Sequence, residues 1–409
     1  MSKIGILSFN HLKDRISIGG GGDDSNLLFK APRTTIGYRY VIGEAAKYHD
    51  IEYVDTDDTE SDYWLASLLS WYDVYNLIRA LKGRKPKAKL IIGGPGVLNP
   101  WIFQDLIYAA VIGRGEGIIN RVIDGDKTVP NVYYSDEPGR MITIGQPTIQ
   151  IDGGSEREFS CGCPKKCFFC EYGWKYKYVN WEGQYREYAN GETFFKDIDF
   201  SRGRITAGLD GLTEYERYVV NKELSSEEII DTLAKHTIRD NAVLKLYCIT
   251  AYPFTDGYDF VEWEDTLARA SKVVRKPITI MLSLSHFCPM PFTPMEDERV
   301  TFHERILQAP KRIGLIKWGT YLQGTTVASA AYEAMIYRAR PDDNIIRFIL
   351  ENKPGKDTAV RIHEVFPHVI DGGYVPLPLI KRQFNTEVGK RLYRQRIESG
   401  KYLIRHNCI

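Results

Sequence analysis

The stretch Cys161-Gly-Cys-Pro-Lys-Lys-Cys-Phe-Phe-Cys170 holds four of the chain's seven cysteines. Within it, Cys163, Cys167 and Cys170 follow the spacing Cys-x3-Cys-x2-Cys. Three thiolates this close on a loop can hold three irons of a cubane and leave the fourth iron open to a substrate or cofactor. The alternative is a zinc knot in which Cys161 supplies a fourth ligand. Against zinc, the sequence has no second Cys or His pair at zinc-finger spacing.

The composition also favours a metal site over disulfides, because seven cysteines are few for a disulfide scaffold of 409 residues. The formal net charge of +1 gives no overall attraction to nucleic acid or membrane. The N-terminal apolar run is too short for a signal peptide, and no stretch approaches the length of a membrane span. We therefore expect a cytoplasmic protein without a membrane partner.

Residues 1–125 alternate short apolar strands with helical patterns. Val74, Leu77, Ile78 and Leu81 recur on one face of a helix that ends near Gly83. This alternation predicts a doubly wound parallel sheet, with ligands at the carboxyl ends of its strands. The expected strands are Ile4–Phe9, Ile51–Val54, Tyr63–Leu69, Leu90–Ile92 and Ala109–Ile112.

Residues 126–150 are polar and turn-rich, which predicts a linker. A second series of strands and helices follows in residues 151–305 and suits a full or partial (β/α) barrel. Residues 306–409 are expected to form a small C-terminal helical and basic region. The clearest units of the barrel are the strands Arg204–Leu209, Val243–Thr250 and Ile278–Ser285, and a helix opened by the capping box Ser225-x-x-Glu228.

The cysteine spacing resembles the signature of the radical S-adenosylmethionine superfamily. The resemblance implies a 4Fe-4S cluster on Cys163, Cys167 and Cys170 whose open iron binds the methionine part of S-adenosylmethionine. An electron from an external donor such as flavodoxin or ferredoxin would then yield a 5'-deoxyadenosyl radical, which takes hydrogen from an organic substrate. Phe169, between the last two cysteines, is assigned to packing near the adenine.

Later segments are similar to the same superfamily in the same order. Arg204 to Lys222 resembles the fourth barrel strand and its helix, where Asp210 replaces the usual glutamate beside the cofactor. Leu244 to Asp256 resembles the fifth strand and its loop. Ser283 to Pro294 resembles the Pro-rich segment after the sixth strand, and so assigns Ser283 and Ser285 to the cofactor. Residues 171–200 depart from the pattern, with Glu192–Asp197 as the candidate second strand.

The first 125 residues are similar to the cobalamin-binding domains of this superfamily. Ser67 to Leu69, Gly93-Gly94 and Gly113 to Glu116 match their motifs. The motif that delivers a histidine to cobalt is missing, because Phe9 stands where Asp should precede His11. Cobalamin is thus possible without a lower axial ligand but not favoured. Large residues in the loops at the sheet's end also argue against it, namely Trp71, Tyr72, Pro95 and Trp101.

Two aromatic and basic segments bear on the substrate. The insertion after Cys170 either packs over the cluster, which we favour, or stacks on bases. Residues 381–405 carry eight Lys or Arg against two Glu, and either hold phosphates or form a solvated helix face. The aromatic and basic residues of the insertion are Trp174, Lys175, Tyr176, Lys177, Tyr178, Trp181, Tyr185, Arg186 and Tyr188, and the aromatic residues of the second segment are Phe384, Tyr393 and Tyr402.

Three functions are consistent with these patterns. The first is an enzyme that rearranges or modifies a nucleotide or a DNA base, resembling phage radical enzymes that isomerise decorated thymidines. The second is a cobalamin-dependent methylase of a small molecule or peptide, and the third is a non-catalytic metal-binding protein. Cys248, Cys288 and Tyr247 could donate hydrogen to a product radical, but we expect core or lining residues.

Overall fold

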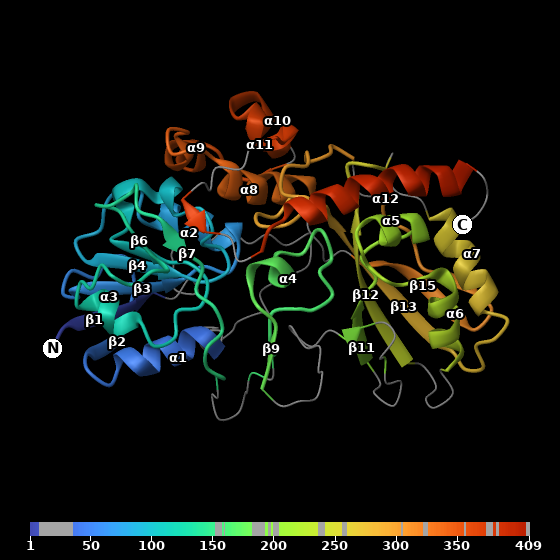
Figure 1. Cartoon of the computed structure of the whole chain (residues 1–409), viewed down its shortest axis with the longest axis horizontal. Helices are drawn as coiled ribbons and strands as arrows, with labels where there is room; N and C mark the ends of the chain where they lie inside the picture. Colours follow the sequence, from blue (N-terminus) through green and yellow to red (C-terminus); the bar gives the residue numbers. More distant parts are fainter. Residues whose placement is uncertain are drawn as a thin grey trace.

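The computed structural model describes residues 1–7, 36–151, 158, 160–181, 193–194, 198, 204–235, 242–255, 260–303, 306–321, 326–355, 357–373, 379–381 and 384–405. Figure 1 shows two α/β halves along the long axis, with the short helix α4 (Glu171–Lys175) between them. Each half is built on a mainly parallel sheet. The predicted α/β class is therefore confirmed.

The first sheet has the strand order β2-β1-β3-β4-β5-β6. All pairs are parallel except β5 with β6. Alternate residues of the strands face two separate apolar cores, so both faces of the sheet are buried, as parallel sheets require. The strands are β1 (Lys3–Leu7), β2 (Asp50–Val54), β3 (Tyr63–Ser67), β4 (Lys89–Gly93), β5 (Ala109–Val111) and β6 (Val132–Tyr134).

Helices cover both faces of this sheet. Residues of α1 (Ile36–Ala45) and α3 (Ile119–Ile123) join one core, while α2 (Trp71–Ala80) and the 3-10 helix Pro100–Leu106 join the other. The predicted helix is confirmed as α2, and its Val74, Leu77 and Ile78 are fully buried. The five predicted strands also form, with ends shifted by one or two residues; Phe9 lies outside the described residues.

Residues 126–150, predicted as a linker, contain two strands. Antiparallel pairing with β5 makes β6 the edge of the first sheet, and β7 (Ile142–Thr143) pairs with β16 (Ile380–Lys381). Val132 and Tyr134 are buried in the core, but three residues are too few for a period-two pattern to stand out. The division of the chain into domains stays a prediction.

The second sheet has the order β10-β11-β12-β13-β15-β14, parallel except for the last pair. Among the described residues it does not close on itself into a barrel. The three predicted strands are confirmed, and the Ser225–Glu228 capping box opens α6 with both hydrogen bonds present. The strands are β10 (Thr193–Phe194), β11 (Arg204–Gly208), β12 (Ala242–Thr250), β13 (Ile278–His286), β14 (Lys311–Ile313) and β15 (Ile316–Tyr321).

Helices α5 (Glu214–Val219), α6 (Ser226–Ala234) and α7 (Val261–Ala270) accompany this sheet. An apolar core lies between the sheet and α6 and α7, and Trp263 and Trp318 are buried in it. β14 and β15 come from residues 306–409, which the sequence predicted as helical. The C-terminal region therefore completes the second sheet before it turns helical.

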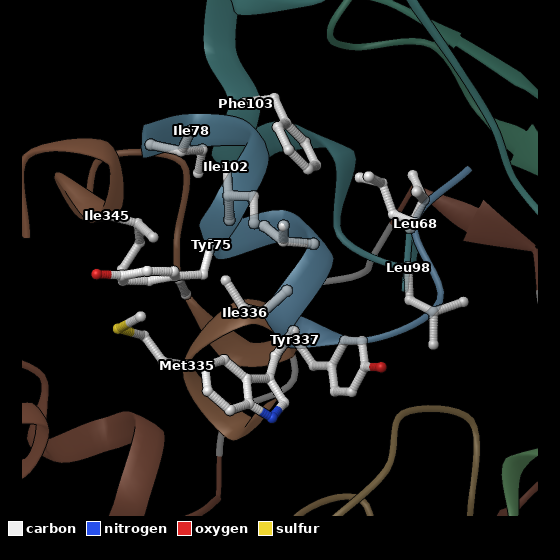
Figure 2. Close-up of a cluster of buried hydrophobic side chains, with 14 of the residues drawn as sticks. Leu68, Tyr75, Ile78, Leu98, Ile102, Phe103, Met335, Ile336, Tyr337 and Ile345 are labelled. Atoms are coloured by element: carbon white, nitrogen blue, oxygen red, sulfur yellow. The ribbon is translucent and has the colours of Figure 1, made fainter. Parts of the chain in front are cut away.

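The C-terminal helices divide between the two halves. α8 (Val327–Arg338), α9 (Ile345–Glu351), α10 (Thr358–Val365) and α11 (Pro367–Asp371) gather over α2, and Figure 2 shows Tyr75 and Ile78 of α2 beside Met335 and Ile345. Trp71 stacks on Tyr332 with ring centroids 4.8 Å apart. α12 (Glu387–Arg405) then runs back along the second half, against α5 (Figure 1). No described helix has the length and apolar character of a membrane span.

Candidate functional site

The three cysteines lie on a closed loop between the two halves of the molecule. β8 (Ser160–Cys161) pairs with β9 (Val179–Asn180) at its base, and we call residues 161–178 the cysteine loop. Gly162 has φ +75°, and a Cβ there would lie 2.7 Å from the Lys177 carbonyl oxygen. Glycine is needed at this point because the two limbs of the loop approach so closely.

The thiols of the loop lie in a protected environment. Burial raises the pKa of the Cys170 thiol to about 11 and that of Cys167 further, so iron would have to displace the protons on binding. The nearby backbone N–H groups of Tyr172 and Gly173 act in the opposite direction and lower the pKa of the Cys170 thiol, and N–H groups of this kind also tune iron-sulfur clusters. Three thiols on one loop with such donors fit a cubane, in which each cysteine holds a different iron.

Within the described part of the chain, no three His, Cys, Asp or Glu side chains converge closely enough to hold a single metal ion. Cys161, the fourth ligand in the zinc alternative, is buried and its sulfur lies 3.7 Å from Arg114 Nη1.

Backbone and aromatic contacts attach the loop to the second half. Phe168 N donates to the Val220 carbonyl over 2.9 Å, and Asn221 Nδ2 donates to the carbonyls of Lys165 and Lys166. Trp174 Nε1 donates to the Cys167 carbonyl over 3.0 Å. Trp174 therefore packs on the loop, as favoured above, while Tyr185, Arg186 and Tyr188 lie outside the described residues.

Asp210 lies just beyond β11 in the left-handed region, with φ +59°. Its carboxylate forms an ion pair with Lys222 Nζ at 2.6 Å, and the Tyr252 hydroxyl donates to its carbonyl. The charges of Asp210 and Lys222 both act on the pKa of Cys167, so this ion pair lies near the cysteine loop. Sequence reasoning found Asp210 but missed Lys222, although both lie in the segment that carried the resemblance.

The two predicted serines lie near the carboxyl end of β13. They alternate with core residues such as Leu282 and Leu284, so they face the side of the sheet away from α6 and α7. Ser283 is 1% exposed and pairs in register with Tyr247, whose carbonyl accepts from Asp210 N. The structure thus brings Asp210 and Ser283 to one edge of the sheet.

Phe169 is partly buried against an aromatic cluster that includes Phe168, Tyr252 and Phe287. This cluster lies beside the loop that carries the cysteines. The assignment of Phe169, Asp210, Ser283 and Ser285 to the cofactor stays a prediction.

A buried group of ionisable side chains adjoins the cysteine loop and was not predicted. Lys175 is 2% exposed and forms an ion pair with Glu171 Oε1 at 3.0 Å. On α8, burial and the charge of Glu171 raise the pKa of Glu333 to about 7, while the Tyr337 hydroxyl donates to its carboxylate over 2.8 Å. The ion pair and the hydrogen bond each join residues four apart on one helix, but helical periodicity cannot reveal that Glu171 and Glu333 lie close together, because α4 and α8 are distant in sequence.

The suggested hydrogen donors have different environments. Cys248 lies in the core of the second half, as expected. Cys288 packs at the edge of the first core, and Tyr247 accepts a hydrogen bond from Lys245.

Several basic residues of α12 are engaged within the protein. Lys390 forms ion pairs with Glu296 at 3.1 Å and Asp297 at 3.4 Å. Arg396 donates to the Tyr218 carbonyl and lies over the Phe168 ring. Tyr393 is 2% exposed, which leaves little of its ring for stacking on bases. The predicted phosphate-binding patch is therefore reduced among the described residues, where Arg391 and Arg394 remain exposed.

A cavity of about 250 Å³ opens at the carboxyl edge of the first sheet, and we call it the sheet-edge pocket. Leu65, Ile91 and Val111 give it apolar walls, and Arg114 and Glu116 are among its few charged residues. An apolar pocket at this edge, with a few polar groups, is the usual site of a cofactor in an open α/β sheet.

Bulky residues do not block this pocket, contrary to the prediction. Of Trp71, Tyr72, Pro95 and Trp101, only Pro95 lines it. Trp71 faces α8, and Trp101 Nε1 donates to the Pro138 carbonyl over 3.0 Å. The apolar, glycine-bordered walls fit a flat apolar group such as the aromatic tail of cobalamin. No histidine is among the described residues that line the pocket, and His11 lies outside the described part.

Neither a family model nor a curated protein matches the chain. Two solved proteins show a weak overall structural similarity to the chain. One is the radical S-adenosylmethionine methyltransferase TsrM from Kitasatospora setae, with cobalamin and a 4Fe-4S cluster bound; it has 10% identity and a TM-score of 0.36, and the match covers 83% of this chain and 86% of that one. The other is the cobalamin-dependent S-adenosylmethionine radical enzyme OxsB, with 9% identity and a TM-score of 0.27.

The match to OxsB covers 100% of this chain and 61% of that chain. Similarities of this size do not assign a function. Of the four large residues expected to fill the pocket, three lie elsewhere. The expectation against cobalamin is therefore not borne out.

Proposed function

We propose that this chain is a radical S-adenosylmethionine enzyme. The observation that carries the proposal is the cysteine loop itself, which presents Cys163, Cys167 and Cys170 beside the edge where Asp210 and Ser283 lie. A cluster with one open iron and a polar edge beside it can bind a small cofactor between them. A zinc knot binds no cofactor and would not need Asp210 and Ser283 beside the cysteines.

The residues of the edge have separate tasks in this proposal. Asp210 orients the cofactor while its ion pair with Lys222 holds the carboxylate in place, and Ser283 and Ser285 offer hydroxyls for hydrogen bonds. Phe169 supplies an apolar surface for the adenine. When bound, the cluster supplies the electron that splits S-adenosylmethionine into methionine and a 5'-deoxyadenosyl radical. An external reductant of the flavodoxin or ferredoxin class then supplies a new electron to the cluster.

The test is anaerobic reconstitution of the full chain with iron and sulfide, reduction with dithionite, and chromatographic assay of 5'-deoxyadenosine. The wild-type chain should bind about four irons and form 5'-deoxyadenosine. Cys167→Ala should lose the product. Cys161→Ala is the matched control, because it removes a thiol of the same loop that is not a ligand in this proposal, and it should keep its iron.

A zinc knot predicts the opposite pattern. The protein would retain zinc, leave S-adenosylmethionine intact, and lose its metal in Cys161→Ala as readily as in Cys167→Ala. That outcome would replace the enzyme with a non-catalytic metal-binding protein.

A second candidate, a cobalamin-dependent methylase of a small molecule or peptide, is favoured by the open sheet-edge pocket. Arg114 and Glu116 would meet the polar rim of the cofactor and the apolar walls its aromatic tail. When bound, cobalamin would supply the methyl carrier. Titration of the protein with hydroxocobalamin, followed by visible absorption, tests this candidate, because the methylase needs tight binding and the first proposal does not.

For the substrate we propose a nucleotide or a DNA base, which the enzyme would rearrange or modify as an isomerase does. The exposed Arg391 and Arg394 on α12 support this class, since basic side chains on one helix suit phosphates. Candidate nucleotides, DNA and peptides can be ranked by how far each stimulates formation of 5'-deoxyadenosine. Stimulation by peptides alone would remove the nucleotide class.

A further inference from the structure

Residues that line the sheet-edge pocket are also attached to the cysteine loop. Arg114 and Glu116 belong to the turn that follows β5, and Tyr176 directly follows α4, which begins after Cys170. The second limb of the loop therefore lines the pocket at Tyr176, and Arg114, which lines it too, reaches the base of the loop. A ligand in the pocket would contact both attachments.

The first attachment is made by the Arg114 guanidinium. Its two terminal nitrogens donate to the two carboxylate oxygens of Glu158, at 2.6 and 2.8 Å, and its Nε donates to Glu116 at 3.0 Å. Nη1 also lies 3.7 Å from the Cys161 sulfur, two residues before the first cluster cysteine. Paired hydrogen bonds of this kind fix the orientation of both partners.

These groups are shielded from water. The side chains of Arg114, Glu116 and Glu158 are 13%, 8% and 16% exposed, so their interactions are only weakly screened. The backbone of Arg114 is held as well, because its N–H donates to the Gly145 carbonyl and its carbonyl accepts from Asn131. A displacement of the guanidinium would thus be felt at Glu158 and Cys161.

The second attachment runs through Gln146, the neighbour of Gly145. Its Nε2 donates to the Lys175 carbonyl over 3.1 Å, and its Oε1 accepts from Lys177 N over 2.9 Å. These two bonds flank Tyr176, which lines the pocket. Both limbs of the cysteine loop are therefore fastened to one short stretch beside the pocket.

We propose that Arg114 is a positioning residue that couples occupancy of the sheet-edge pocket to the iron-sulfur centre. A ligand that contacts Arg114 changes how firmly Glu158 and Cys161 hold the base of the loop. By linkage, the assembled cluster changes the affinity of the pocket by the same factor. This inference rests on the proposed function, since it assumes the cluster.

The test compares the affinity of hydroxocobalamin for the reconstituted and the iron-free full chain, titrated anaerobically and followed by visible absorption. The two dissociation constants of the wild type should differ at least about fivefold, the lower end of allosteric coupling. In Arg114→Gln the ratio should fall to about one. Glu158→Gln should also lower the ratio, because it weakens the paired hydrogen bonds to Arg114 without removing a residue that lines the pocket.

Arg121→Gln is the matched control. Arg121 also forms an ion pair with a carboxylate, Asp126, but lies on the surface away from the pocket, so its substitution should leave the ratio at the wild-type value. A merely structural loss in the other variants would weaken binding in both states and leave the ratio intact.

Equal affinities in the two wild-type states, an unchanged ratio in both variants, or no binding of hydroxocobalamin would each overturn the inference. Iron content and 5'-deoxyadenosine are measured on the same preparations. A chain that forms the product but shows a ratio of one keeps the proposed function and loses the coupling. A chain without iron or product loses the proposed function itself.

Discussion

Single ionisable residues near the cysteine loop depend on partners from other elements. Asp210 is held in an unusual backbone conformation by the Tyr252 hydroxyl and carries a charge balanced by Lys222. Asp and Asn tolerate the left-handed region better than most residues. The position therefore suits an aspartate whose carboxylate must keep one orientation.

Asp210→Asn should fold normally but form 5'-deoxyadenosine at least about tenfold more slowly, because a charge-assisted contact worth about 1.5–3 kcal/mol is lost. The rate of product formation at saturating and limiting S-adenosylmethionine measures this. Asp126→Asn removes an exposed ion pair with Arg121 and should change nothing. Equal rates in both variants would remove Asp210 from the cofactor site.

Glu216 gives the protein a pH-dependent stability. Burial raises its pKa to about 7, against two backbone N–H groups that lower it. A carboxyl with a raised pKa binds a proton in the folded state that the unfolded chain has already released, so stability falls as pH rises from about 4.5 through 7. Glu216→Gln should flatten this fall, which amounts to roughly 3 kcal/mol.

Chemical denaturation at pH 5, 6, 7 and 8 measures the effect. The difference in unfolding free energy between the wild type and Glu216→Gln should shift in favour of the variant as the pH rises. A difference that is constant with pH would show that Glu216 is already ionised in the folded protein.

At the level of elements, the long α12 depends on small residues where it crosses its neighbours. A Cβ at Gly400 would lie 2.3 Å from the Tyr215 ring, whereas one at Gly43, in the exposed part of α1, would meet nothing within 4 Å. The two helical glycines thus differ only in their surroundings.

Gly43→Ala should raise the melting temperature slightly, since alanine is favoured in a helix by about 1 kcal/mol. Gly400→Ala should lower it by displacing α12 from α5, at a cost of about 1–3 kcal/mol. The melting temperatures of the two variants, measured by thermal unfolding, test both expectations. If Gly400→Ala were as stable as Gly43→Ala, the packing of α12 on α5 would be wrong.

The sequence predicts these elements best where the pattern is long. α2, β12 and β13 were found because their buried residues recur at a regular spacing over two turns or nine residues. β6 and β14 were missed because they have only three residues each, and neither Val132 nor Lys311 stands out until its partner strand is known.

The same distinction holds for the site. Cys163, Cys167 and Cys170 are close in sequence, so their spacing alone is enough to predict an iron-sulfur cluster. Arg114 with Glu158, and Glu171 with Glu333, come from elements far apart in the chain, and only the tertiary fold brings them together. The bulk of Trp71 misled because a sequence shows size but not direction.

For the molecule as a whole, α8 contacts both halves, because Arg338 donates to the carbonyls of Glu296 and Glu298 while other residues of this region pack on the first half. α8 contributes Tyr332 to a stack with Trp71, and Asn99 donates to the Ala339 carbonyl over 2.8 Å. The first sheet therefore has part of its core supplied by residues beyond 326.

Trp71→Ala should lower the unfolding free energy by about 3–5 kcal/mol and separate the unfolding of the first half from that of the second. Tyr53→Ala is the control. Tyr53 lies on β2 of the first sheet and is 53% exposed, so the substitution should cost less than about 0.5 kcal/mol. Calorimetry and limited proteolysis show whether one transition becomes two. A single, unshifted transition would contradict the fastening by α8.

The crossing of α12 over the cysteine loop also fixes an order of assembly. Tyr393 packs on Phe168, and Gly389 lies against Trp174, so the loop is covered by a helix that the ribosome makes more than two hundred residues later. Because domains fold from the N-terminus as they are synthesised, the thiols spend that interval uncovered. Under the proposed function, iron and oxidants would both reach the thiols most easily in this window, before α12 covers the loop.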